Sequence, residues 1–219
     1  AVENFFSKAA PALFMGWSNL NFDRRMFHFN FFKGNRYPYA THSSPNQEHD
    51  GLHIARAAQT LNSETLKTEL TEAGNPSLAL ESLSRMQGFD TSASHTAYVD
   101  ALNSLRVLRI IKDKHKEKWE KFLKTSTKSS VETLLTNDEI YSIFENVKGR
   151  NMMYLACTLH PKHAFHPSYA SWGYLWDLRR DPEPLLNLSV NQLRDTLKKI
   201  SPKALRVLKT NKAPVVLDK

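Results

Sequence analysis

The sequence predicts an α/β protein, and three observations indicate it. A short apolar run, Ala12 to Trp17, follows Pro11 and has the length and composition of a buried strand. Amphipathic helical patterns then occupy the middle of the 219-residue chain. Strand-like runs separated by loops return in its last third, so both kinds of element are expected in one chain.

The first predicted strand leads into a turn and a helix. Asn19 to Asp23 is typical of a strand-to-helix turn, and the helix after it is rich in aromatic residues. Its buried stripe is expected to consist of Met26, Phe27, Phe31 and Phe32. Residues 37–46 are rich in Pro, Ser and Asn and predict a loop.

Three further helices are expected before residue 125. The apolar spacing predicts one over residues 50–61 and a shorter one over residues 77–86. Ser94 is a suitable N-cap for a long helix that continues to about Leu123, with its lysines on the solvated face. Residues 125–130 are Ser, Thr and Lys, and we interpret them as a linker and domain boundary.

The segment beyond residue 130 has a different character. Strands are predicted at 152–158 and 172–178, a helix at 187–200 with Ser189 as its N-cap, and short terminal strands at 206–208 and 215–217. No internal repeat is found in the sequence.

Composition and charge narrow the classes of function. Apolar runs are too short to span a membrane, so no membrane partner is expected. The single cysteine, Cys157, allows no internal disulfide and favours the cytoplasm. The net charge of +8 suits a polyanionic partner such as nucleic acid, because each phosphate contact releases counterions. A basic surface without a ligand is the alternative.

Two separated segments carry residues suited to metal-dependent hydrolysis. Asp23 is presented just after the first predicted strand, and His95 and Asp100 lie five residues apart at the start of a predicted helix. A two-metal phosphodiesterase needs carboxylates that hold the ions and a base that takes a proton from the attacking water. Each segment alone is also compatible with an ordinary helix cap or an unremarkable histidine.

The order of these segments resembles the bacterial exonuclease I family, whose members are DEDD-type 3′→5′ exonucleases. The resemblance covers nearly the whole chain and includes the segments PALFMGWSNLNFDRRMF (11–27), HDGLHIARAAQTL (49–61), SLALESLSRMQGFDTSASHTAYVDALNSLRVLRII (77–111), SWGYLWDLRRDPEPLLNLSVNQL (171–193) and LKTNKAPVVL (208–217). Asp50, in the second segment, stands at the family's usual acidic position at the start of that helix.

The resemblance implies a fold and a domain organisation. Residues 1–124 would form the C-terminal part of an exonuclease domain with an RNase-H-like mixed sheet flanked by helices. Residues 125–219 would form a small β-barrel module with a helix, which helps to close a basic channel for single-stranded DNA.

The resemblance also implies an activity. Asp23 and Asp100 would bind two Mg²⁺ ions, which Mn²⁺ could replace, and His95 would be the general base. Single-stranded DNA would be degraded from its 3′ end to nucleoside 5′-monophosphates in DNA repair. The protein would act as a monomer, with single-strand-binding protein as a partner. Arg24, Arg25, Arg150 and Trp172 are candidates for contacts with the DNA.

Several departures from the family pattern leave a second interpretation open. The Asp-x-Glu of the family's first motif has no counterpart here, Arg24 and Arg25 stand where the family usually has acidic residues, and Ala79 replaces a commonly basic residue. The family's C-terminal helical domain also has no counterpart. We expect the chain to be an internal piece of a longer exonuclease that lacks the first strands of the sheet. The alternative is a truncated, inactive relative that only binds single-stranded nucleic acid.

Three smaller alternatives concern single features. An RNA substrate is compatible with two-metal chemistry. Cys157, His160, His163 and His166 have residue types that suit zinc, but their spacing favours a solvated loop. Trp172, Tyr174 and Trp176 share one face of a predicted strand, where we favour barrel core over stacking of bases.

Overall fold

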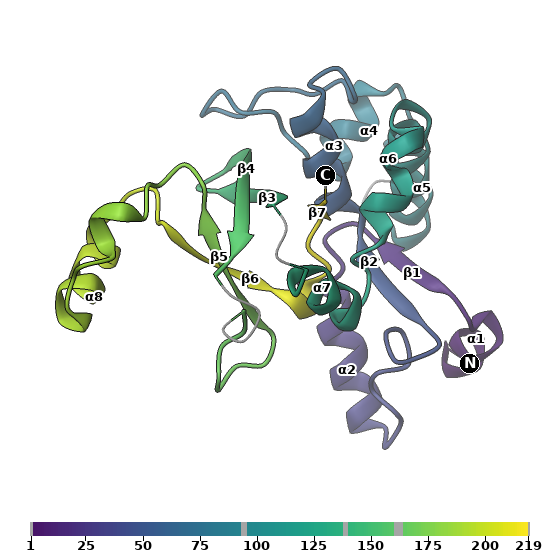
Figure 1. Cartoon of the computed structure of the whole chain (residues 1–219). Helices are drawn as coiled ribbons and strands as arrows, with labels where there is room; N and C mark the ends of the chain where they lie inside the picture. Colours follow the sequence, from purple (N-terminus) through teal and green to yellow (C-terminus); the bar gives the residue numbers. More distant parts are fainter. Residues whose placement is uncertain (1, 93–95, 138–139, 160–163, 219) are drawn as a thin grey trace.

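A computed structural model describes residues 2–92, 96–137, 140–159 and 164–218 and confirms the α/β class. Figure 1 shows helices around a short two-stranded sheet, and a separate five-stranded sheet beside them. The elements up to residue 123 are α1 (Val2–Ala9), β1 (Leu13–Gly16), α2 (Asp23–Lys33), β2 (Gln47–Asp50), α3 (Gly51–Leu61), α4 (Leu80–Met86), α5 (Ala97–Lys114) and α6 (Lys116–Leu123).

The remaining elements build the second sheet and its helices. They are α7 (Lys128–Leu135), β3 (Ile140–Val147), β4 (Arg150–Thr158), β5 (Trp172–Asp177), the 3-10 turn η2 (Glu183–Leu185), α8 (Val190–Lys199), β6 (Leu205–Lys209), the 3-10 turn η3 (Thr210–Lys212) and β7 (Val216–Leu217). The sheet is antiparallel throughout, in the order β6-β5-β4-β3-β7.

The first sheet is small and parallel. β1 pairs with β2 in the register Leu13 with Gln47 and Gly16 with Asp50. Helix α3 starts directly at the end of β2, and its apolar side enters a core shared with α4, α5 and α6. That core is built around the fully buried Ile54, Leu83, Val107, Ile111 and Phe122.

The second sheet has a core of its own, between its inner face and α7. It contains Val131, Leu134, Leu135, Tyr141, Ile143, Tyr154, Ala156, Leu175, Leu208 and Val216. Gly173 lies where β5 passes α7, and a Cβ atom there would stand 2.7 Å from Leu135 Cδ1, so a larger residue would force the Leu135 side chain to shift.

Two strands contribute side chains to both cores. In β3, Tyr141 and Ile143 enter the core of the second sheet, while Phe144 faces the opposite way into the helical core. In β7, Val216 enters the core of the second sheet and Leu217 enters the helical core. Alternation of side chains along a strand therefore joins the two cores through the sheet itself.

Three predictions of secondary structure need correction. The expected stripe of α2 is not buried: Phe27 and Phe31 pack around Phe6 of α1, but Met26 and Phe32 are exposed. The long helix predicted to reach Leu123 is broken at His115 into α5 and α6.

The predicted linker is the third correction. Residues 125–130 lead directly into α7, where Thr127 is the N-cap and forms a capping box with Ser130. Thr125 is fully buried. Ser and Thr suit both loops and helix caps, and here the cap applies.

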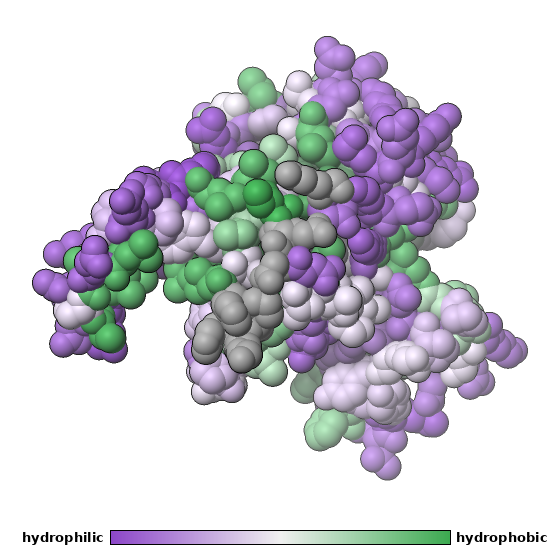
Figure 2. All heavy atoms as spheres, viewed as in Figure 1, coloured by the Kyte–Doolittle hydropathy of each residue, from purple (hydrophilic) through white to green (hydrophobic). Residues whose placement is uncertain are grey.

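The aromatic face of β5 was also assigned wrongly to the barrel core. Gly173, Leu175 and Asp177 point inward, whereas Trp172, Tyr174 and Trp176 lie half-buried on the outer face. Figure 2 shows that hydrophobic atoms also gather over the β3–β4 hairpin, where Met153 and Leu155 are exposed. No helix in the described ranges has the length and apolarity needed to cross a bilayer.

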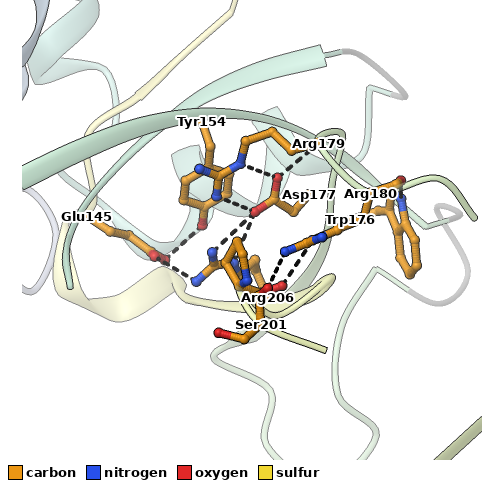
Figure 3. Close-up of polar contacts among 9 residues, drawn as sticks. Glu145, Tyr154, Trp176, Asp177, Arg179, Arg180, Ser201 and Arg206 are labelled. Carbon is orange, nitrogen blue, oxygen red and sulfur yellow. Dashed lines mark hydrogen bonds and ion pairs between the residues drawn. The ribbon is translucent and has the colours of Figure 1, made fainter. Parts of the chain in front are cut away.

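A charged network closes one end of the inner core of the second sheet (Figure 3). The fully buried Asp177 accepts hydrogen bonds from Arg179 at 2.6 and 2.8 Å and from Arg206 at 3.2 and 3.3 Å. Both guanidinium groups also lie over the ring of Tyr154, whose hydroxyl donates to Glu145. Burial opposes ionisation of Asp177, but the bonds from Arg179 and Arg206 hold its pKa below the usual value.

We expect Asp177→Asn to lower the free energy of unfolding by about 3 kcal/mol, because the mostly buried Arg206 then keeps only the longer 3.7 Å contact with Glu145 and loses its charged hydrogen bonds to Asp177. A carboxyl group with a depressed pKa stabilises the fold above its unfolded pKa of about 3.9, and this contribution is lost as pH falls through the folded value. Urea titrations should therefore show the deficit near neutral pH and a smaller one in acid. Asp195→Asn, at an exposed helix position, is the matched control; equal losses in both variants would refute the role of the network.

Candidate active site

The turn between β1 and α2 is held by one buried carboxylate. Asp50, at the end of β2, accepts hydrogen bonds from the backbone N–H of Ser18 at 2.8 Å and of Leu20 at 3.4 Å. The same side chain caps α3 by accepting from Leu52 N at 3.0 Å. Asp50 therefore fixes both the start of α3 and the turn that precedes Asp23.

A buried ion pair holds the start of α2. Arg24 Nε lies 2.5 Å from Glu48 Oε2, and only 4% of the Glu48 side chain is exposed. Asn19 also donates to Glu48, at 3.4 Å. Burial raises the pKa of Glu48, although the charge of Arg24 opposes the rise. Arg24 is thus bound to β2, which the sequence did not indicate.

The C-terminal segment also contacts this turn. Lys212 Nζ donates to Leu20 O at 3.2 Å, and Arg24 Nη1 donates to Asn211 O at 3.0 Å. Both bonds join residues almost two hundred positions apart in the sequence. The turn η3 of the second sheet therefore packs on the turn that presents Asp23.

Asp23 and Asp100 line the same cavity, which has a volume of about 450 Å³. Asp23 is the first residue of α2 and Asp100 lies in the first turn of α5, so each carboxylate comes from a helix start. Much of the rest of the wall is apolar and includes Phe14, Trp17 and Leu80. Glu48 also lines the cavity, but its carboxylate is paired with Arg24, so Asp23 and Asp100 are the two lining carboxylates that come from helix starts.

These two carboxylates suit a divalent cation but do not complete a site. Oxygen ligands are those that Mg²⁺ prefers, and Mg²⁺ keeps several waters, so few protein ligands are needed. Within the described ranges, no group of three or more His, Cys, Asp or Glu side chains is arranged to hold a metal. Asp23 and Asp100 could therefore supply part of a metal site.

The other predicted site residues either fall outside the described residues or do not line this cavity. His95, the predicted base, falls outside the described residues, as do His160 and His163 of the zinc alternative. Arg25 is exposed beside Arg24 on α2, Arg150 is exposed at the start of β4, and Trp172 stacks on Tyr169 with ring centroids 4.6 Å apart. Arg150 and Trp172 do not line the cavity of Asp23 and Asp100.

Sequence reasoning missed the residues that support the site. Glu48 lies in a four-residue polar strand, and Asn211 and Lys212 lie near the end of the chain. No local pattern marks such partners, because their contacts depend on the tertiary fold. The adjacent charges of Arg24 and Arg25 were the one available indication of such a partner. If either arginine is buried, it requires an acidic side chain beside it.

Comparison with known proteins supports the resemblance. A curated protein named Exodeoxyribonuclease I from Haemophilus influenzae is 25% identical over 213 residues, which cover 92% of this chain and 45% of the relative. The protein of the same name from Buchnera aphidicola is 26% identical over 230 residues, covering 97% and 46%. The chain thus spans less than half the length of the curated relatives it matches. No protein-family model matches it.

Solved structures show the same fold. A crystal structure of E. coli exonuclease I in complex with a dT13 oligonucleotide aligns with a TM-score of 0.79 at 20% identity, covering 100% of this chain and 48% of the other. An ExoI/SSB-Ct complex aligns with a TM-score of 0.76 at 20% identity, covering 99% and 48%. The resemblance to exonuclease I is confirmed, and with it an α/β fold matching that enzyme.

We expect Arg24→Met to lower the free energy of unfolding by about 3 kcal/mol, because it leaves the buried Glu48 without its cation. The pKa of Glu48, already raised in the fold, should rise further. A carboxyl group whose pKa is raised in the folded state stabilises the fold at pH values below its unfolded pKa. This stabilisation is lost as the pH increases through the pKa of the folded state. The deficit should therefore be larger near pH 7.5 than near about pH 5.

Urea unfolding of Arg24→Met, Glu48→Gln and the double variant tests this pair. Adding Glu48→Gln should recover part of the loss, since no buried charge then remains. Arg36→Met removes the exposed pair with Glu3 and should cost less than about 1 kcal/mol. A pH-independent deficit that Glu48→Gln does not reduce would contradict the assignment.

Proposed function

We propose that this chain is part of an exonuclease I-type enzyme that removes nucleotides from the 3′ end of single-stranded DNA. The observation that carries the proposal is the cavity lined by both Asp23 and Asp100, the two carboxylates that the family resemblance marks as metal ligands. The names of the curated relatives support a nuclease, and their greater length means that the activity would belong to a larger protein.

The mechanism assigns distinct roles to the residues of the chain. Asp23, in the first turn of α2, and Asp100, in the first turn of α5, would hold divalent ions through their carboxylate oxygens. Mg²⁺ is the expected metal, and Mn²⁺ could replace it. Such ions lower the pKa of the attacking water and neutralise charge at the scissile phosphate. His95 would accept the proton of the water, and nucleoside 5′-monophosphates would leave.

The fold proposed for this part of the protein is RNase-H-like. Among the described strands, β1 pairs only with β2, so its other edge is free for a further strand. Three carboxylates line the cavity, but Glu48 is paired with Arg24, and two ions need more carboxylates than Asp23 and Asp100 supply. A strand beside β1 that carries an Asp-x-Glu would meet both needs, because it would extend the sheet and end near Asp23.

Contacts with DNA would come from both parts of the chain. We propose residues 1–124 as exonuclease domain and residues 125–219 as a β-barrel-type module at the DNA channel. Arg25, Arg150 and Trp172 remain candidates for contacts with the strand. Arg24 is a weaker candidate, since its guanidinium is occupied by Glu48 and Asn211 O. A monomer that interacts with single-strand-binding protein is proposed from the resemblance and the similar ExoI/SSB-Ct complex.

Release of mononucleotides from a 3′-accessible single strand, by the larger protein that contains this chain, tests the proposal. We expect Mg²⁺-dependent release that falls at least about a hundredfold in Asp100→Asn and in Asp23→Asn, because each variant loses a metal-binding charge. Asp113→Asn, at an exposed position near the end of α5, is the matched control and should retain activity. Absence of release by the unsubstituted larger protein, with salt-sensitive binding of the strand, would instead support a non-cutting relative.

A further inference from the structure

A second cavity lies between helix α3 and the second sheet. Its volume is about 220 Å³, and we call it the α3–β6 pocket. Its walls come from α3, β3, β6, η3 and the segment after η3. The polar side chains that line it are His53, Arg56, Glu145, Asn146, Lys209 and Lys212.

The pocket has an excess of positive charge. Arg56, Lys209 and Lys212 are cationic, whereas Glu145 is the one acidic residue in its wall. The carboxylate of Glu145 is already engaged, since it accepts from the Tyr154 hydroxyl at 2.9 Å and lies 3.7 Å from Arg206. Figure 3 shows Glu145 directed toward these two side chains. The three cations are thus not neutralised by the acid beside them.

Arg56 is the main indication that the pocket binds an anion. Its side chain is half-buried at the middle of α3, and no hydrogen bond or ion pair of its guanidinium is found within the described ranges. Burial lowers the pKa of Arg56, and the charge of Asp50 only partly opposes this effect. Half-buried guanidinium groups are normally paired, because desolvation without a partner costs free energy.

Lys212 connects the pocket to the candidate active site. Burial is the main cause that lowers the pKa of Lys212, and the positive charges of Arg24, Arg25 and Lys209 lower it further. Its ammonium group donates to Leu20 O in the turn before Asp23. Positive charge therefore gathers along a path from the start of α2 to the pocket, which attracts a polyanion.

We propose that the α3–β6 pocket binds a phosphate group of the nucleic-acid strand, as a site separate from the metal cavity. The planar fork of Arg56 can donate two parallel hydrogen bonds to a phosphate, and Lys209 can add a point charge at the mouth. The choice of a DNA phosphodiester as the ligand rests on the proposed function. A free phosphate ion is the other ligand that could make the same contacts.

Binding without divalent metal tests the site independently of cleavage. The probe is a dye-labelled oligothymidylate of about 12 nucleotides, titrated by fluorescence anisotropy at several salt concentrations. Arg56→Gln and Lys209→Gln should each weaken binding about tenfold at low salt. The slope of log K against log salt should become shallower by about 0.7 for each phosphate that the variant no longer neutralises.

Matched controls separate a local contact from net charge. Arg109→Gln on α5 and Lys118→Gln on α6 remove the same charges from exposed positions outside the pocket. We expect both to retain the parent's affinity and slope. Arg56→Gln should keep or raise the unfolding temperature, since it removes an unpaired buried charge; marked destabilisation would show a structural role and overturn the proposal.

The remaining outcomes identify the source of the phosphate. Inorganic phosphate, titrated as a competitor, should displace the oligonucleotide weakly from the parent and not detectably from Arg56→Gln. Loss of phosphate binding with unchanged oligonucleotide binding would overturn the DNA assignment and leave a free-phosphate site. Equal weakening in Arg56→Gln and Arg109→Gln would overturn the site itself. Absence of nuclease activity, with these binding differences present, would contradict only the proposed function.

Discussion

The arrangement of the candidate active site depends on the buried carboxylate of Asp50. One side chain accepts from the backbone of Ser18, Leu20 and Leu52, and so ties the turn after β1 to the first turn of α3. Ser18 has a positive φ of 59°, a conformation that costs free energy for a residue with a side chain. The bond to its N–H compensates for that conformation and sets the direction in which Asp23 leaves the turn.

Space around this carboxylate is limited as well. Gly51 follows Asp50 directly, and a Cβ atom at this position would stand 3.1 Å from both Gly16 O and Trp17 Cε3. The close approach of α3 to the end of β1 therefore favours glycine. The ion pair of Arg24 with Glu48 and the contacts from η3 add to the same turn from its other sides. Several independent contacts thus hold one short loop, which is what placement of a metal ligand requires.

Local sequence signals predicted those elements whose cause is local. The apolar run at β1 and the Ser189 cap of α8, which forms a capping box with Gln192, are found where expected. β2 escaped prediction because Glu48, His49 and Asp50 are polar yet buried, so its pattern does not resemble a strand. The break at His115 was also missed, since neither Gly nor Pro marks it.

The candidate site shows the same division. Asp23 and Asp100 were identified through a family resemblance, and the structure places both on one cavity. Glu48, Lys212 and Arg56 were not identified, because their roles come from contacts between distant segments. The aromatic side chains of β5 illustrate the limit of periodicity: alternation indicated that they share a face, but not which face of the sheet is covered.

The two strands that contribute to both cores have a consequence for how the chain unfolds. Phe144 cannot leave the helical core without moving Tyr141 and Ile143 out of the other, and Leu217 and Val216 are coupled in the same way. The two halves of the molecule should therefore melt as a single cooperative unit rather than one after the other. A polypeptide cut near residue 125 would separate the helical core from Phe144, Val215 and Leu217, so the halves should be recovered together or not at all.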